Sequence, residues 1–265
     1  MKNIVIITAS AIIALSLIAM LAFSAPPDAN QQRFPIPLGE TLTYRVTEKS
    51  SGKSAIPSSK VVLSEHNFTA TTLENGSKAI QHTCREVRSD GATQKWLFYY
   101  ANAGSAIRAL SFSGQRYTPK GILYFHEEAK FGDPFYKFPS DTVHLISVPY
   151  LLASTDFAPG KTLSMHTWAQ EGPATKINIS VCGEERVTVP WKTVNAWKVC
   201  TKADTESLTK PMGAMGKIFE MILPEFTIWF DKDTPHRPVK IYGVFGPLTP
   251  GKPEYIQELT KVTNN

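Results

Sequence analysis

Apolar and polar residues alternate along much of the chain, and the pattern is clearest near the C-terminus. The runs 226–230 and 239–245 are rich in aromatic and β-branched residues, which suit a pleated, half-buried surface. The polar stretch between them contains two prolines and is typical of a hairpin connection. Asp231, Asp233 and Arg237 lie in this turn, and we predict that they hold it structurally, with Arg237 pairing an aspartate.

Similar short runs recur upstream at the spacing expected of an antiparallel sheet. We predict strands at 38–46, 60–64, 67–73, 79–87, 95–100, 107–112, 121–125, 177–189 and 194–201. Asn-Gly and Asp-Gly pairs at 75–76 and 90–91 supply the turn chemistry that joins such strands. The pattern therefore predicts a mainly β domain, an antiparallel meander that forms a β-barrel or half-open barrel with one or two short helices.

Two stretches depart from the alternation. Residues 143–153 follow Ser140 and Asp141, either of which is a suitable helix cap, and Pro149 keeps that helix short or kinked. Between 204 and 224, apolar residues recur at three- and four-residue steps, which predicts a Met-rich amphipathic helix. Its apolar stripe either packs in the core or forms a soft lid over a ligand, because Met adapts to varied partners. The candidate lid residues, which would contact the ligand, are Met212, Met215, Ile218, Phe219 and Ile222.

The N-terminus has the composition of an export segment. Lys2 precedes a nearly uninterrupted apolar run over 4–23, and Ala22-Phe23-Ser24 fits the small-x-small pattern of signal peptidase. About 20 apolar residues also suffice to span a bilayer, so residues 1–24 are either a cleaved signal peptide or a retained N-terminal anchor. We expect 25–37 to form a Pro-rich tether and 38–265 a single domain in the periplasm. Membrane contact would run through residues 4–23.

Composition narrows the class of partner. Of the 265 residues, 42% are hydrophobic and 19% charged, which argues against disorder. The formal net charge of +5 is spread along the chain rather than clustered, so a nucleic-acid partner is not expected.

The three cysteines suggest one disulfide. The predicted strands 177–189 and 194–201 flank a turn at 190–193, and a turn centred on Trp191 would place Cys182 directly opposite Cys200. Outside the cytoplasm such a pair is expected to be oxidised, which would contribute roughly 3 kcal/mol in the chain-entropy model. Cys84 is left over and is predicted to be a buried, small hydrophobic residue.

Motifs that specify a reaction or a metal are missing from the sequence. None of the six histidines forms an H-x-H or H-E-x-x-H pair, and there is no C-x-x-C. Nucleophile elbows and glycine-rich phosphate loops are also missing. We therefore predict no metal, no cofactor and no enzymatic activity, with a hydrolase as the least favoured alternative.

Three short segments resemble an uncharacterised Gram-negative envelope family, domain of unknown function 3108. They are Leu38-Gly39-Glu40 with Leu42, Tyr44 and Val46; Gly183, Glu185, Val187, Val189 and Pro190 with Ala196, Lys198 and Val199; and Trp229, Phe230 and Asp233 with Arg237 to Ile241. The likeness spans roughly 37–262, apart from the Met-rich stretch, which looks like an insertion. It implies an exported, barrel-like domain, similar in outline to lipoprotein carriers and lipocalins, and it implies no reaction.

Two functions remain open. The first is a binding module whose barrel holds a lipid or other hydrophobic small molecule. The second is a structural or assembly protein that acts on other envelope proteins through exposed sheet edges or through the lid.

Overall fold

The computed structural model describes residues 36–49, 60–103, 106–130, 138–139, 141–168, 174–204, 225–243 and 254–264. Its strands are β1 (Glu40–Lys49), β2 (Val61–Thr72), β3 (Lys78–Arg88), β4 (Thr93–Ala103), β5 (Ala106–Tyr117), β6 (Leu123–Lys130), β7 (Thr142–His144), β8 (Thr162–Trp168), β9 (Thr175–Thr188), β10 (Thr193–Ala203), β11 (Phe226–Asp231), β12 (Pro238–Gly243) and β13 (Glu254–Asn264). Two short helical segments follow β7, the 3-10 turn η1 (Leu145–Ser147) and the helix α2 (Val148–Leu152).

All the described strands belong to one 13-stranded sheet, with the order β6-β5-β4-β3-β2-β1-β13-β12-β11-β10-β9-β8-β7. Neighbouring strands are antiparallel except β7 and β8, which are parallel. The first and last strands, β1 and β13, pair with each other in the middle of this order. The predicted fold class, an antiparallel meander with short helices, is confirmed.

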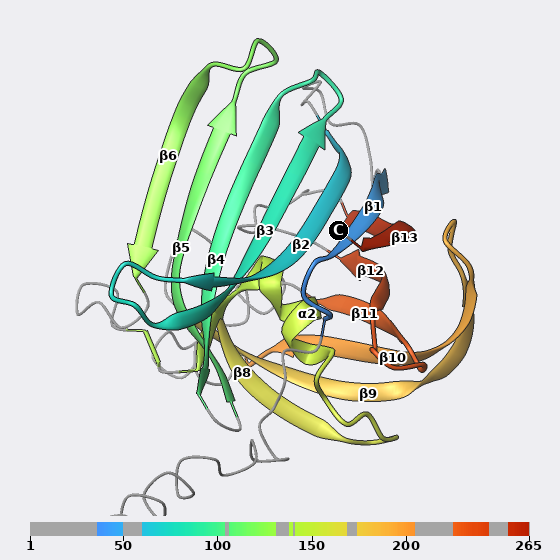
Figure 1. The fold of residues 1–265 in the computed structure, drawn as a ribbon. Helices are drawn as coiled ribbons and strands as arrows, with labels where there is room; N and C mark the ends of the chain where they lie inside the picture. Colours follow the sequence, from blue (N-terminus) through green and yellow to red (C-terminus); the bar gives the residue numbers. More distant parts are fainter. Residues whose placement is uncertain are drawn as a thin grey trace, which may run out of the picture.

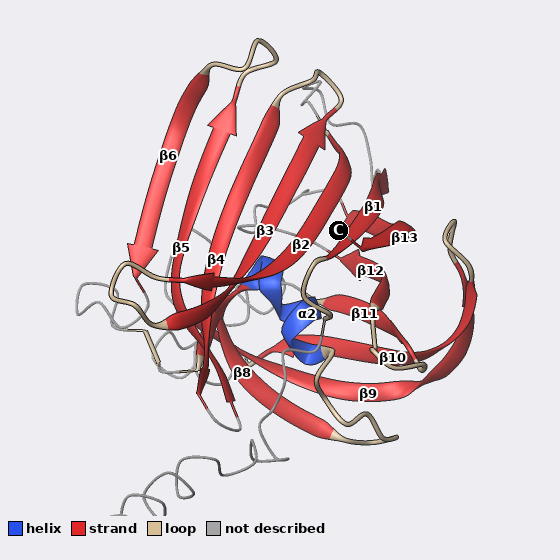
Figure 2. Ribbon diagram, in the orientation of Figure 1, coloured by secondary structure: helices blue, strands red, loops and turns tan. Residues whose placement is uncertain are grey.

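The sheet curves into a half-open barrel, and α2 lies on its concave side (Figures 1 and 2). All five residues of α2 are buried. The strands at the two ends of the order, β6 and β7, do not pair in the described part of the chain, so hydrogen bonds do not close the barrel there. Side chains bridge this seam instead, since the rings of Phe112 on β5 and Trp168 on β8 lie 4.8 Å apart.

The alternation in the sequence explains which faces are buried. On β1, Leu42, Tyr44 and Val46 point into the core, while the residues between them are partly or fully exposed. Because successive side chains of a strand point to opposite faces, one face of each strand can be apolar and buried while the other is polar and exposed to solvent. The same rule places Ile177, Ile179 and Val181 of β9 inside the barrel.

Several predicted boundaries were wrong. The helix expected over 143–153 is shorter, because Thr142–His144 pairs with β8 and only Val148–Leu152 is α-helical. The cap is also different, since the His144 side chain, rather than Ser140 or Asp141, accepts the Ile146 N–H at the start of η1. The runs 60–64 and 67–73 form one strand, β2, and the strands β8 and β13 were missed.

Cys182 and Cys200 form a disulfide, with their Cα atoms 6.0 Å apart. The pairing is confirmed, but the predicted register was wrong, because Cys200 lies opposite Ser180. A bulge leaves Cys182 without a ladder partner, and its side chain reaches Cys200 from there. Cys84 is free and buried, as predicted.

Some predicted segments lie outside the described residues. These are residues 1–24, most of the tether and the whole candidate lid, including Met212, Met215, Ile218, Phe219 and Ile222. Among the helices that are described, none is long and apolar enough to cross a membrane.

Candidate functional site

A chain of polar side chains runs through the buried interior, where β2 and β3 face η1. Ser64 Oγ lies 2.8 Å from His66 Nε2, and His66 Nδ1 lies 3.0 Å from His82 Nε2. His82 Nδ1 in turn lies 3.2 Å from Ser147 Oγ. Residues two apart on a strand share a face, so β2 aims both Ser64 and His66 inward. Every ring nitrogen of the two histidines therefore has a partner.

This polar chain, Ser64–His66–His82–Ser147, is fully hydrogen-bonded with both imidazoles neutral. A neutral imidazole has one N–H donor and one bare acceptor nitrogen, so the protons can run along the whole chain in either direction. An extra proton would place a positive charge in this buried interior, which desolvation disfavours. Burial lowers the pKa of His66 to about 3 and that of His82 well below its usual value.

Cys84 lies beside this chain but is not an activated nucleophile. Its Sγ is 3.9 Å from both Ser64 Oγ and His66 Nε2. Burial raises the pKa of the thiol well above its usual value, with a smaller contribution from Glu86. A reactive cysteine needs the thiolate, which forms beside cationic groups or helix N-termini. Here both the thiol and its nearest imidazole are neutral.

Tyrosine rings from β1 and α2 cover the polar chain. The Tyr150 ring of α2 lies 4.4 Å from His66 and 5.1 Å from His82, measured between centroids. Tyr44 donates its hydroxyl to the Pro238 carbonyl at 2.7 Å. Burial raises the pKa of both tyrosines, which therefore stay protonated. This layer binds α2 to the sheet and keeps water away from the histidines.

His144, the last residue of β7, lies in an aromatic pocket next to the polar chain. Its ring is 4.9 Å from Phe98, 5.6 Å from Phe112 and 5.7 Å from Trp168. The Trp96 ring lies on the same side at 6.1 Å. We refer to His144 and these four rings as the His144 pocket. Burial lowers the pKa of His144 to about 3, so the imidazole is neutral.

Gly114 of β5 makes room for one wall of the His144 pocket. A Cβ atom built on this glycine would lie 2.1 Å from Cζ3 of Trp96. The indole therefore lies directly on the backbone of the neighbouring strand, where it pairs across the ladder. A residue without a side chain is required at this close approach.

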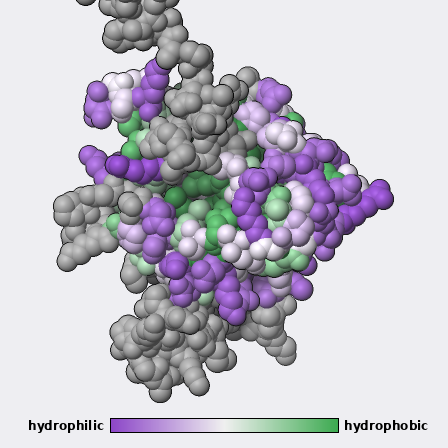
Figure 3. All heavy atoms as spheres, turned by 90° about the horizontal axis from the view of Figure 1, so that it is seen from below, coloured by the Kyte–Doolittle hydropathy of each residue, from purple (hydrophilic) through white to green (hydrophobic). Residues whose placement is uncertain are grey.

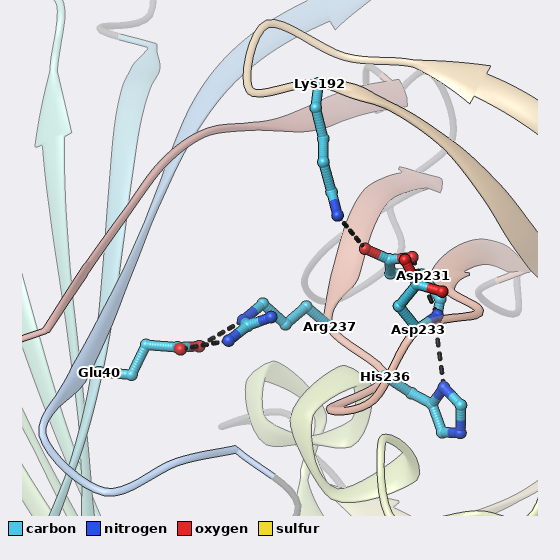
Figure 4. Close-up of polar contacts among 6 residues, drawn as sticks. All are labelled: Glu40, Lys192, Asp231, Asp233, His236 and Arg237. Carbon is cyan, nitrogen blue, oxygen red and sulfur yellow. Dashed lines mark hydrogen bonds and ion pairs between the residues drawn. The ribbon is translucent and has the colours of Figure 1, made fainter.

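The predicted turn residues form a separate cluster at the rim of the barrel (Figure 4). Arg237 binds Glu40 of β1 with both arms of its guanidinium, Nε at 2.7 Å and Nη2 at 2.6 Å. This hydrogen bonding raises the pKa of Arg237. The expectation that Arg237 pairs an aspartate was wrong, because the antiparallel order brings β1 close to the β11–β12 turn.

Asp231 is the acceptor at the centre of that turn. Its Oδ2 lies 2.8 Å from Lys192 Nζ, and its Oδ1 accepts the Asp233 backbone N–H at 3.1 Å. His236 Nδ1 lies 2.9 Å from the Asp231 carbonyl oxygen. Asp233 takes part through its backbone N–H in these contacts. The structural role of Asp231, Asp233 and Arg237 stays a prediction.

The sequence-predicted site residues that the structure describes do not converge on one place. The disulfide is on the outer side of β9 and β10, next to a depression of about 730 Å³ that Cys200, Lys202 and Glu225 help to line. A second depression, of about 470 Å³, includes Asp231 and Asp233. Within the described ranges, no set of three or more His, Cys, Asp or Glu side chains is arranged to hold a metal ion.

The polar chain and the His144 pocket were not predicted from the sequence. Ser64-x-His66 and His82-x-Cys84 place polar residues at the inward positions of otherwise apolar, alternating strands. This pattern could have indicated a buried polar contact, because a polar residue at an inward-facing position of a strand needs a hydrogen-bond partner in the interior. The contact between the two strands depends on their register, which no local motif reports.

Comparison with known proteins gives a fold and a family. No curated protein matches the chain. A Brucella abortus structure described as a β-barrel-like protein of domain of unknown function DUF1849 aligns over 86% of this chain and 98% of that one, with a TM-score of 0.51 and 10% identity. A Bacteroides fragilis protein with a YmcC-like fold aligns over 87% and 98%, with a TM-score of 0.38 and 10% identity. The Brucella likeness shows a shared barrel-like fold.

A family model settles the relationship. The family described as a protein of unknown function, DUF3108, matches residues 98–244, from within β4 to just past β12. This range includes His144 and the rings of Phe98, Phe112 and Trp168, but not Trp96, and it includes the β11–β12 turn. The resemblance noted from three short segments is thereby confirmed, and the chain belongs to the DUF3108 family.

Proposed function

We propose that this DUF3108 protein is an exported binding module that holds a hydrophobic or lipid-like molecule at the opening of its half-open barrel. The observation that carries the proposal is the hollow in Figure 3, where hydrophobic residues form the floor and polar residues lie along part of the edge. Sites for small apolar molecules have this character, with apolar walls and few polar groups. Exposed apolar surface rimmed by polar residues is uncommon without a partner.

The middle of the barrel is filled, which limits where such a molecule can lie. Large, fully buried side chains that occupy it include Tyr44, Phe68, Phe98, Tyr100 and Tyr150. A ligand is therefore expected to insert from the opening rather than to occupy an empty lumen. The α2 helix forms the inner limit of that insertion.

Two parts of the proposal, export and the lid, are based on the sequence. The apolar run 4–23 and the small residues before Ala25 support secretion into the periplasm, with the N-terminus either cleaved or retained as an anchor. The Met-rich segment, with Met212 and Met215, would cover the opening and exchange contacts with the ligand as it enters. N-terminal sequencing of the protein from a periplasmic fraction tests the first point, with Ala25 as the expected first residue after cleavage.

Native mass spectrometry of the protein purified from its own envelope tests ligand binding. We expect an excess mass that disappears after organic extraction, and uptake of a fluorescent fatty-acyl reporter by the extracted protein. If the native mass equals that of the polypeptide alone and the extracted protein takes up no reporter, the proposal is overturned. The double variant Gly213→Ala/Gly216→Ala should slow exchange of the reporter, because each change favours helix by roughly 1 kcal/mol and stiffens the lid.

An assembly role is the second candidate, favoured by the free edge of β6. Ile122, Leu123 and Tyr124 are 61%, 47% and 59% exposed, and β6 ends the strand order. Exposed edges accept further strands from partners. A photo-crosslinking residue at position 124 should capture a defined envelope protein in cells if this role is real. Crosslinking no stronger than at the exposed Lys95 of the outer face would count against it.

A further inference from the structure

The His144 side chain carries an N–H donor that has no acceptor in the described structure. His144 Nδ1 accepts the backbone N–H of Ile146 at 3.3 Å. Since a neutral imidazole has one protonated nitrogen, the proton must be on Nε2. Nε2 is buried and has no hydrogen-bond partner among the residues described, although His144 as a whole is only 3% exposed. Leaving such a donor unpaired in the interior is unfavourable.

A second unpaired group lies on the same face of β7. Thr142 is 2% exposed, and its Oγ1 also has no hydrogen-bond partner in the described part of the chain. Residues 142 and 144 are two apart on one strand and so share a face. A hydroxyl can donate or accept, whereas the imidazole N–H can only donate. Two buried, unpaired polar groups on a three-residue strand point to a missing partner.

The surroundings of His144 define what that partner can be. The nearest rings belong to Phe98, Phe112 and Trp168, and they offer only weak contacts to an N–H. The four rings that define the pocket carry no charge, and among the described residues the Arg116 guanidinium lies 5.9 Å from the Trp96 ring. The pocket therefore suits an uncharged oxygen acceptor on an apolar body.

Next to the His144 pocket, the described aromatic side chains include one that is only partly buried. The Phe138 ring lies 5.3 Å from Trp168, and Phe138 is only partly buried. Trp168 in turn lies 5.7 Å from His144. A molecule that enters beside Phe138 would meet aromatic surface first and the polar groups last.

We propose that the His144 Nε2–H, supported by the Thr142 hydroxyl, anchors the ligand by donating to an uncharged acceptor oxygen such as an ester carbonyl. This inference rests on the proposed function and adds the class of molecule, a lipid with a neutral, oxygen-bearing head. The free energy of binding comes from the apolar chain, and the orientation comes from the hydrogen bond. The role of His144 is thus recognition rather than proton transfer.

Matched probes test the proposal. Methyl laurate, tetradecane and laurate differ in the head group and share a long apolar chain, and binding is followed by the fluorescence of the protein's tryptophans. We expect methyl laurate to bind tighter than tetradecane by roughly 3- to 10-fold, the contribution of one hydrogen bond. Laurate at pH 7 should bind more weakly than the ester, because a carboxylate would be buried without a cation.

The variant His144→Phe should abolish the preference for the ester over tetradecane. The exposed His126→Gln is the control and should preserve the preference. Because His144→Phe also removes the acceptor for Ile146 and could unfold the protein, nitrogen NMR of the unmodified protein gives an independent readout. The Nε2–H resonance of His144 should shift with methyl laurate and stay unchanged with tetradecane.

The outcomes separate this inference from the proposed function. If all three probes fail to bind, both are wrong. If the ester and the alkane bind equally, or the Nε2–H resonance does not shift when the ester is added, the proposed hydrogen bond from His144 is wrong while ligand binding stands. Laurate binding more tightly than the ester at pH 7 would overturn the uncharged head.

Discussion

Acid should destabilise this protein through its buried histidines. In the unfolded chain a histidine titrates near pH 6.5, whereas burial lowers the pKa of His66 and His144 to about 3. Above pH 6.5 each imidazole is neutral in both states, so folding carries no proton-linked cost. Between pH 6.5 and 3 only the unfolded state takes up the proton, and stability falls as the pH falls.

The size of the effect follows from the two pKa values. From pH 6.5 to pH 5, one such histidine lowers the free energy of unfolding by about 2 kcal/mol, from 1.36 kcal/mol per pH unit. His66 and His144 together would remove about 4 kcal/mol, and His82 acts in the same direction. Glu86 opposes them, because burial raises its pKa to about 7 and its protonation on acidification favours the folded state.

A variant isolates the histidine contribution from that of Glu86. Urea unfolding of the wild type and of His144→Gln at pH 7 and pH 5 gives two differences in unfolding free energy. We expect the stability advantage of the wild type to shrink by about 2 kcal/mol at pH 5, because the glutamine does not titrate. The same comparison with the exposed His126→Gln should show no change. A His144→Gln difference that is independent of pH would refute the reasoning.

Four further predictions concern stability and burial. Loss of the disulfide in Cys182→Ser/Cys200→Ser should lower the unfolding free energy by about 3 kcal/mol. Two free thiols at 182 and 200 in native protein would contradict this expectation. Cys84 should react with an alkylating agent only after unfolding. Arg237→Ala should cost about 3 kcal/mol, because it leaves Glu40, whose side chain is 2% exposed, without its partner. The exposed Arg45→Ala, which breaks an ion pair with Glu258, should cost less than 1 kcal/mol, and equal losses by thermal melting would argue against this ranking. Gly114→Ala should cost about 1–3 kcal/mol and shift the emission of Trp96, whereas Ser113→Ala on the other face should do neither.

The sequence predicts the sheet much better than it predicts the site. Period-2 alternation identifies strands such as β1 and β9 because one face of each is buried and the other is not. β13 is harder, since most of its residues are only partly buried and the alternation is weak. The short strand Thr142–His144 is invisible locally, because its parallel pairing with β8 is a long-range contact. The His66–His82 contact and the His144 pocket depend on the same kind of information, which emerges only once the register is known.

The pairing of β1 with β13 has a consequence for how the chain folds. These strands are separated by most of the sequence, yet their ladder joins the two halves of the sheet. Before Glu254–Asn264 is available, β1 and β12 are each left with one unpaired edge, and the halves have no shared backbone ladder. Contacts between residues so far apart in sequence slow folding. The sheet can therefore be completed only after Glu254–Asn264 has emerged, and a chain truncated before β13 would leave the edges of β1 and β12 open to aggregation.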